Sequence, residues 1–288
     1  MGISAGTDHY KECCAVCGEP MVRCSGWLAK CPGCGFLAST LPPGAGTGIE
    51  GLETTRKANF EKLLDRLEEH RKLVGLLLLE VGCAKGLFLD AARRRGAEVR
   101  GIEPEVSNAT IAREKGFTVE SGFFPGECGG PYDVIAFNDV FEHIPNPAQA
   151  LKSVERALKP GGIALLNLPT SDGVLYRVGT ALDRLGFSAP FERLWQKGLP
   201  SPHVSYFNEH NLNLLARNHT QLIVLDHVRL STISRRGLYD RVKCVNGGLI
   251  GDLLFAGAWL FSFVADVLPA DIEATFLVHP IPESDYPA

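Results

Sequence analysis

Short apolar runs alternate with amphipathic helical patterns along most of the chain. The run at 76–81 is apolar except for Glu80, which is typical of a parallel strand buried on both faces. The best marked helix has Asn146 as its cap and Pro147 in its first turn, and Pro160-Gly161-Gly162 is expected to end it. This alternation predicts an α/β fold with a doubly wound, parallel sheet. The predicted strands are 76–81, 98–102, 118–120, 133–137, 163–168, 222–228 and 273–278, with helices at 86–95 and 106–115 among those between them.

The chain divides into three zones. Residues 1–40 are rich in cysteine and lack a periodic apolar pattern, and a Pro/Gly linker follows at 41–51. Residues 52–288 carry the strand and helix patterns, with a helical insertion expected at about 247–268. We therefore expect a small cysteine module, a linker and one larger α/β domain.

A glycine turn follows the first strand of the larger domain. The spacing Gly82-x-x-x-Gly86 differs from the Gly-x-Gly-x-x-Gly of dinucleotide enzymes, although it also suits a ligand lying against backbone at a strand end. The second strand ends at Glu103, whose carboxylate can accept hydrogen bonds from both hydroxyls of an adenosine ribose. A glycine turn of this kind also occurs in α/β proteins that bind other ligands or none, and Cys83 inside it is expected mainly to pack.

Four segments together resemble the motifs of class I S-adenosylmethionine (SAM) methyltransferases. They are Glu80-Val-Gly-Cys-Ala-Lys-Gly86, the acidic Glu103, the stretch 137–151 (FNDVFEHIPNPAQAL) and Leu158-Lys-Pro-Gly-Gly162. The chain is most similar to the bacterial branch that contains ubiquinone-biosynthesis O-methyltransferases and sugar methyltransferases, over about residues 55–230. The resemblance implies a Rossmann-like sheet and SAM as cofactor.

The resemblance also assigns residues to parts of the cofactor. Glu80 and Gly82 would border the methionine part of SAM, Glu103 the ribose, and Asn138 the transferable methyl group. Residues around Ser121 and Gly122 would lie near the adenine. The full expected cofactor set is Glu80, Gly82, Cys83, Gly86, Glu103, Pro104, Ser121, Gly122, Asn138 and Asp139. Asn138-Asp-Val-Phe differs from the Asn-Pro-Pro-Tyr/Phe motif, which argues against methylation of an exocyclic base nitrogen.

The cysteine module contains two Cys-x-x-Cys pairs, each followed by glycine. Cys14, Cys17, Cys31 and Cys34 predict a zinc ribbon with a four-thiolate, structural zinc ion, because four protein ligands leave no open position for a substrate. Cys13 and Cys24 could compete as ligands, and redox cysteines or disulfides are the alternative. Six of the nine cysteines lie between Cys13 and Cys34, and a cytoplasmic location favours metal binding over disulfides.

Charge and composition bear on the partner. The formal net charge of −4 and the lack of a basic stripe argue against a nucleic-acid backbone as the main partner. Some sugar C-methyltransferases and some ribosomal-RNA methyltransferases of this branch carry a cysteine module, and the acidic charge favours the former. Residues 249–268 are nearly all apolar, but Asp252 and Asp266 oppose a membrane span. A buried or dimer-forming helix is favoured, with peripheral membrane contact as the alternative.

The favoured function is SAM-dependent methyl transfer to a small-molecule, sugar or lipid-linked acceptor, on oxygen or carbon. The alternatives are a non-catalytic SAM-fold module that recruits a partner through its zinc ribbon, and an RNA methyltransferase. Histidine titrates near neutral pH, so His203 and His143 are the candidate bases, with Tyr206 as an orienting neighbour of His203. A purely structural role is the alternative for each histidine.

Overall fold

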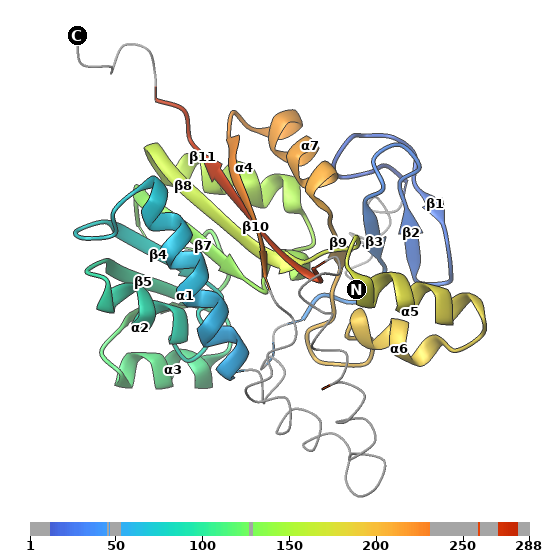
Figure 1. The fold of residues 1–288 in the computed structure, drawn as a ribbon, viewed down its shortest axis with the longest axis horizontal. Coiled ribbons are helices and arrows are strands. Elements are labelled where there is room, and N and C mark those ends of the chain that lie inside the picture. Colours follow the sequence, from blue (N-terminus) through green and yellow to red (C-terminus); the bar gives the residue numbers. More distant parts are fainter. Residues whose placement is uncertain are drawn as a thin grey trace, which may run out of the picture.

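A twisted seven-stranded sheet forms the centre of the molecule (Figure 1). The computed structural model describes residues 12–44, 46, 53–126, 129–230, 259 and 270–281. The sheet order is β10-β11-β8-β7-β4-β5-β6. Strands β4 to β8 are mutually parallel, whereas β11 runs antiparallel to both of its neighbours. The strands are β4 (Leu77–Val81), β5 (Glu98–Glu103), β6 (Thr118–Ser121), β7 (Tyr132–Asn138), β8 (Leu158–Pro169), β10 (Ile223–Leu230) and β11 (Ile272–Val278).

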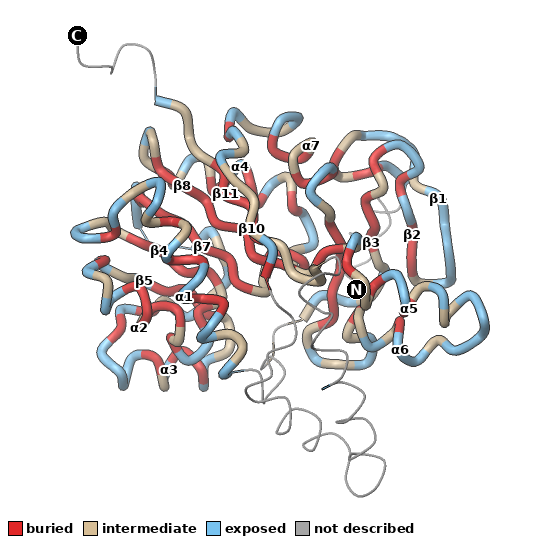
Figure 2. Tube along the Cα trace, in the orientation of Figure 1, coloured by how far each residue is buried: buried red, intermediate tan, exposed pale blue. Residues whose placement is uncertain are grey.

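Helices cover both faces of this sheet and bury its central strands, which Figure 2 shows mostly in red. One face packs against α1 (Glu53–His70), α2 (Leu87–Arg94) and α3 (Val106–Glu114). The other packs against α4 (Pro147–Ala157) and α7 (Glu209–His219). The core strand β7 is buried at every position, which explains the apolar run at 134–137 within it. The predicted doubly wound α/β fold is therefore confirmed.

A second, smaller sheet lies beside the first and joins distant parts of the chain. Its order is β1 (Val22–Arg23), β2 (Leu28–Lys30), β3 (Leu37–Ser39) and β9 (Ser205–Tyr206). The first three strands belong to the cysteine module, which we call the ribbon (residues 12–40). Strand β9 comes from the larger domain and pairs with β3 in antiparallel register. A helical hairpin, α5 (Val174–Arg184) and α6 (Ser188–Leu194), packs beside this sheet.

Helix α4 ends earlier than the sequence predicted. Helix α4 begins at Pro147 with the Asn146 side chain accepting from the Gln149 amide, as predicted, but it ends at Ala157. The Pro160-Gly161-Gly162 motif lies inside β8 instead, where the pairing with β7 is irregular. A residue before proline avoids the helical conformation, so the helix ends early.

The helical insertion predicted at 247–268 lies outside the described residues, apart from Trp259. No helix within the described ranges is long and apolar enough to cross a membrane.

Candidate functional site

The turn between β4 and α2 has an unusual backbone at the carboxyl edge of the sheet. Gly82, Ala84 and Gly86 have φ angles of 69°, 45° and 79°. A Cβ atom at Gly82 would lie 2.5 Å from the Val140 side chain, and one at Gly86 would lie 2.9 Å from the Phe117 ring. The sequence suggested glycine as space for a ligand. The protein's own packing and backbone already require it at both positions.

Glu103 is fixed at the end of β5 by two backbone amides. Its Oε2 atom accepts from the Ala84 amide at 2.8 Å, and its Oε1 atom accepts from the Glu105 amide at 2.9 Å. Burial nevertheless raises the pKa of this carboxyl. The Asn108 side chain on α3 also donates to this carboxyl. An ionised carboxylate has about four acceptor positions, so about one remains for a hydroxyl donor. The carboxylate is therefore held between the glycine turn and α3 with capacity to accept a hydrogen bond from a ligand hydroxyl.

A chain of polar side chains crosses the ends of three neighbouring strands. The Asn138 amide on β7 donates to Glu80 Oε1 on β4 at 3.0 Å, and the Asn167 amide on β8 donates to Asn138 Oδ1 at 3.2 Å. Glu80 is 3% exposed, and its Oε2 atom has no hydrogen-bond partner among the described residues. Burial raises the pKa of Glu80 to about 8. Asn167 was not predicted, although it is the polar exception in the apolar strand at 163–168.

The other expected cofactor residues surround this edge. Asp139 has a φ of 55° and forms an ion pair with Arg56 of α1 at 3.2 Å. The Gly122 amide donates to the Glu103 carbonyl, which places the end of β6 beside β5. Ser121 accepts from Arg113 at 2.6 Å, and Pro104 follows Glu103 directly. Cys83 is buried, and a Cβ atom at Gly101 would lie 2.5 Å from its sulfur. Its thiol therefore packs against β5.

A second cluster combines both candidate histidines with a carboxylate that the sequence analysis did not select. Glu142 lies on a short 3₁₀ helix, η2 (Phe141–His143), just after β7, and His203 precedes β9. The Nε2 atoms of His143 and His203 each lie 3.9 Å from Glu142 Oε1, and the two rings are 4.8 Å apart. Glu142 is 1% exposed. Its position beside His143 in the sequence was the only available signal.

Burial determines how these groups ionise. It raises the pKa of Glu142 well above its usual value, helped by the nearby Asp139, and it lowers the pKa of both histidines. Burial therefore favours the protonated form of Glu142 and the neutral forms of both histidines. A neutral imidazole has a lone pair that can accept a proton, which an imidazolium lacks.

The two histidines differ in how they are held. His143 Nδ1 is 2.9 Å from the Pro202 carbonyl, which fits the structural alternative. His203 Nε2 is 2.8 Å from the Gln196 amide nitrogen, which can only donate, so this ring nitrogen is an acceptor. Tyr206 donates its hydroxyl to the Leu194 carbonyl at 3.1 Å, and its ring centre is 5.4 Å from that of His203. The structure brings the three predicted residues together but does not test their roles.

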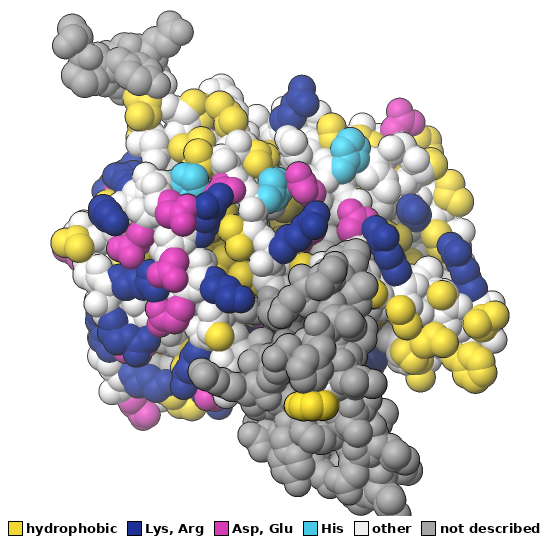
Figure 3. Space-filling view, in the orientation of Figure 1, with side chains coloured by type: hydrophobic (Ala, Val, Ile, Leu, Met, Phe, Trp, Pro, Cys, Tyr) yellow, Lys and Arg dark blue, Asp and Glu magenta, His cyan; other side chains and the backbone are white. Residues whose placement is uncertain are grey.

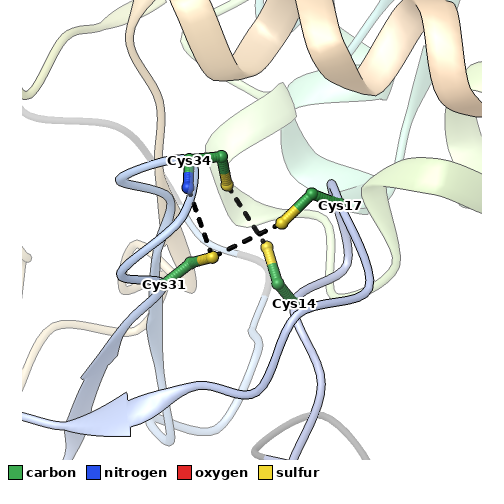
Figure 4. A group of neighbouring side chains, drawn as sticks. All are labelled: Cys14, Cys17, Cys31 and Cys34. Atoms are coloured by element: carbon green, nitrogen blue, oxygen red, sulfur yellow. Dashed lines mark hydrogen bonds between the residues drawn. The ribbon is translucent and has the colours of Figure 1, made fainter.

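The four cysteines of the ribbon point toward one another from two equivalent turns (Figure 4). Cys14 and Cys34 sulfurs are 3.5 Å apart, Cys17 and Cys31 sulfurs are 3.4 Å apart, and all four lie within 4.8 Å of one another. A tetrahedral zinc ion with bonds of about 2.3 Å places its sulfurs about 3.8 Å apart, so this cage fits zinc. Burial also raises the pKa of Cys14 to about 11, so a cation is needed to hold its thiolate.

Residues 52–220, more than half of the chain, match the family model described as "Methyltransferase domain". The chain belongs to this methyltransferase family. A ubiquinone biosynthesis O-methyltransferase from Pseudomonas paraeruginosa is 32% identical over 110 residues, which are 35% of this chain and 47% of that protein. The corresponding enzyme of Caulobacter vibrioides is 34% identical over 119 residues, or 36% and 46% of the two chains. The methyltransferase chain thus spans about half the length of these curated relatives.

Solved structures share the methyltransferase fold at low sequence identity. The cyclopropane synthase MmaA2 of Mycobacterium tuberculosis superposes with a TM-score of 0.55 at 17% identity, covering 83% of this chain and 90% of that one. Magnesium protoporphyrin IX methyltransferase of Synechocystis, solved with bound S-adenosylhomocysteine (SAH), gives a TM-score of 0.51 at 14% identity, covering 82% and 89%. The fold is that of class I SAM-dependent methyltransferases.

Proposed function

We propose that this protein transfers the methyl group of SAM to an oxygen or carbon atom of a small-molecule acceptor. The main support for this proposal is a pair of buried carboxyl groups, Glu80 and Glu103. They lie at the ends of neighbouring strands, on either side of the Gly82 turn. Glu103 keeps about one free acceptor position for a ribose hydroxyl, and the Oε2 atom of Glu80 has no hydrogen-bond partner among the described residues. The likeness to ubiquinone biosynthesis O-methyltransferases supports a small-molecule acceptor.

Bound SAM would supply a methyl group on a positively charged sulfur, which is a good leaving group. The protein's task is then to hold the acceptor atom in line with that methyl group and to keep water away. Asn138 would stand beside the methyl group, held by its bonds to Glu80 and Asn167. An acceptor hydroxyl or acidic carbon must lose a proton during transfer. His203 would take this proton once its Nε2 lone pair leaves the Gln196 amide.

We further propose that the ribbon holds one zinc ion through Cys14, Cys17, Cys31 and Cys34, in a structural role. The cytoplasm remains the expected location. On the face drawn in Figure 3, Lys and Arg side chains are mixed with Asp and Glu over α1 and α2. This mixed charge gives no specific support to the RNA methyltransferase alternative.

Calorimetric titration of the zinc-loaded protein with SAH tests the cofactor assignment. We expect one site per chain. Incubation with methyl-labelled SAM and a panel of phenols, catechols and sugar nucleotides then tests turnover, read as label in the product by mass spectrometry. Wild-type protein that binds neither SAM nor SAH would end the proposal. Tight binding without turnover on any acceptor would favour the non-catalytic binding module instead.

A further inference from the structure

The ribbon and the candidate acceptor site share backbone hydrogen bonds. Strand β3 pairs with β9, with Leu37 opposite Tyr206 and Ala38 opposite Ser205. Beyond this pairing, the Ser39 amide donates to the Val204 carbonyl at 2.8 Å, and the Ser39 hydroxyl donates to the His203 carbonyl at 3.0 Å. The ribbon therefore contacts the backbone of the candidate base directly.

Aromatic packing reinforces this contact. Phe36 of the ribbon lies against Phe207, with ring centres 5.1 Å apart. Trp27 lies against Trp195, with ring centres 5.6 Å apart, and the Trp195 carbonyl accepts from the His203 amide. All five positions from 203 to 207 are buried. Ribbon side chains thus cover one side of the segment that carries His203, while the larger domain holds its other side, where the Val204 amide donates to the Glu142 carbonyl at 2.9 Å. Within the described part of the chain, β9 has no strand partner in its sheet other than β3.

The position of β3 depends in turn on the cysteine cage. Strand β2 ends at Lys30 and β3 begins at Leu37, so the Cys31–Cys34 turn is the loop of this hairpin. The Cys31 amide donates to the Phe36 carbonyl at 2.8 Å and closes the turn beside the sulfurs. A short hairpin of this kind is marginal without a further constraint, and a metal ion bound by its loop supplies one.

We propose that the ribbon is part of the acceptor site, with Ser39 as the positioning residue that holds His203 in place. Loss of the metal would then release His203 and its neighbours while leaving the SAM-binding edge intact. The expected SAM residues lie on or just after β4, β5, β6 and β7, all in the other sheet. The role of the ribbon in the acceptor site rests on the proposed function. The contact between the ribbon and residues 203–207 can be measured without any acceptor or turnover.

Hydrogen–deuterium exchange of the full-length protein tests the contact. Ser39→Ala removes the hydroxyl bond to His203. Ser25→Ala is the matched control because it removes an exposed serine hydroxyl whose bond, accepted from the Trp27 amide at 3.4 Å, stays within the ribbon. In Ser39→Ala, we expect exchange in the peptide covering 203–207 to rise about fivefold, as for one lost hydrogen bond. Zinc content and SAH affinity should stay unchanged. Exchange equal to that of Ser25→Ala would overturn the role of Ser39.

Removal of zinc with a chelator tests the metal dependence. We expect exchange at 203–207 to rise at least about tenfold, while peptides of β4 and β5 keep their protection and SAH affinity changes less than about twofold. Loss of protection in the ribbon with no change at 203–207 would overturn the proposal. If chelation unfolds the whole chain, or if no zinc is present, the Ser39→Ala comparison decides the role of the ribbon. Failure of wild-type protein to bind SAH would refute the proposed function without affecting these exchange results.

Discussion

Glu80 is a buried carboxyl whose pKa of about 8 links the stability of the protein to pH. In the unfolded chain a glutamate ionises near pH 4.5, so above that pH the folded state binds a proton that the unfolded state has lost. The contribution of Glu80 to stability is therefore fully present below pH 4.5 and is lost as the pH rises toward 8. This direction is opposite to that of an ion-paired carboxylate.

The variant Glu80→Gln should remove this pH dependence, because a glutamine carbonyl can still accept from Asn138 and does not ionise. We expect the wild-type free energy of unfolding to fall with pH by at most about 1.4 kcal/mol per unit from this residue. Urea unfolding at pH 5, 6.5 and 8 measures the slope, with the exposed Glu98→Gln as control. Equal slopes in wild type and Glu80→Gln would contradict the prediction.

Glu103 should contribute to cofactor affinity through a hydrogen bond from the ribose. Glu103→Ala is expected to weaken SAH binding by about 1.5–3 kcal/mol, the typical loss for hydrogen bonds to a charged acceptor. Calorimetric titration measures this change. Glu98→Ala, at the exposed opposite end of β5, should bind as wild type does. Unchanged affinity in Glu103→Ala would remove the ribose assignment.

His203 should affect turnover and not cofactor affinity. His203→Ala is expected to lower kcat by about 100-fold or more, the usual range for loss of a general base, with SAH affinity nearly unchanged. Since burial lowers the pKa of His203 well below 6.5, its protonation should cause no fall in kcat between pH 8 and 6.5. His210→Ala, an exposed histidine of α7, is the control. A variant that retains full turnover would show that His203 has only a structural role.

The sequence predicted those site residues that follow a strand directly. Glu80 and Glu103 are recognisable because each interrupts or ends an apolar run at a predictable edge of the sheet. Glu142 and Asn167 were missed because His203 and Asn138 lie far from them in the chain and meet them only through the fold. Gln196 is only seven residues from His203, but no periodic pattern in that segment indicated that the two side chains meet. Their identities as acid or amide carried no information about those neighbours.

At the scale of the elements, periodicity predicted the larger sheet well. Each of the seven predicted strands overlaps a strand of this sheet. The central parallel strands β4, β7 and β8 are mostly buried and have the strongest apolar pattern, whereas β5, β6 and β10 are partly exposed. The α5–α6 hairpin and β9 were not predicted. Leu185 and Phe187 at the tip of that hairpin are 73% and 66% exposed, so apolar positions there do not mark a buried face. Strand β9 has two residues, too few for any period.

The ribbon is an element whose stability should depend on its metal. Elemental analysis should find one zinc per chain, and Cys31→Ser with Cys34→Ser should abolish binding. A metal of this kind contributes on the order of 10–16 kcal/mol in small zinc modules, so the stripped ribbon should unfold. The core on the α1–α3 face of the larger sheet contains no ribbon residue, whereas the core on the other face includes Val16 and Phe36. The larger sheet should therefore retain most of its secondary structure by circular dichroism. Cys13→Ser, on an exposed spare thiol, is the control.

A ribbon that keeps its protection without metal, or that contains a disulfide between Cys14 and Cys17 in reducing buffer, would contradict the zinc assignment.

At the scale of the whole molecule, the apolar stretch 249–268 bears on whether detergent is needed to recover the protein. Asp252 and Asp266 favour packing of this stretch against protein over burial in lipid, because each would cost up to about 3 kcal/mol near a bilayer centre. We expect recovery of the protein without detergent. Fractionation by centrifugation measures this, with high-salt and carbonate washes as controls. Recovery only in a membrane fraction that resists both washes would favour membrane association of this stretch over packing against protein.

The pairing of β3 with β9 also has a consequence for synthesis on the ribosome. Ser39 leaves the ribosome long before Ser205, which is about 166 residues later in the chain. At 5–20 residues per second, the open edge of β3 would wait on the order of ten seconds or more for its partner strand. An unpaired edge strand invites pairing with other chains. Early zinc binding would then hold the nascent ribbon in its folded conformation. A ribbon expressed alone would keep the edge of β3 exposed.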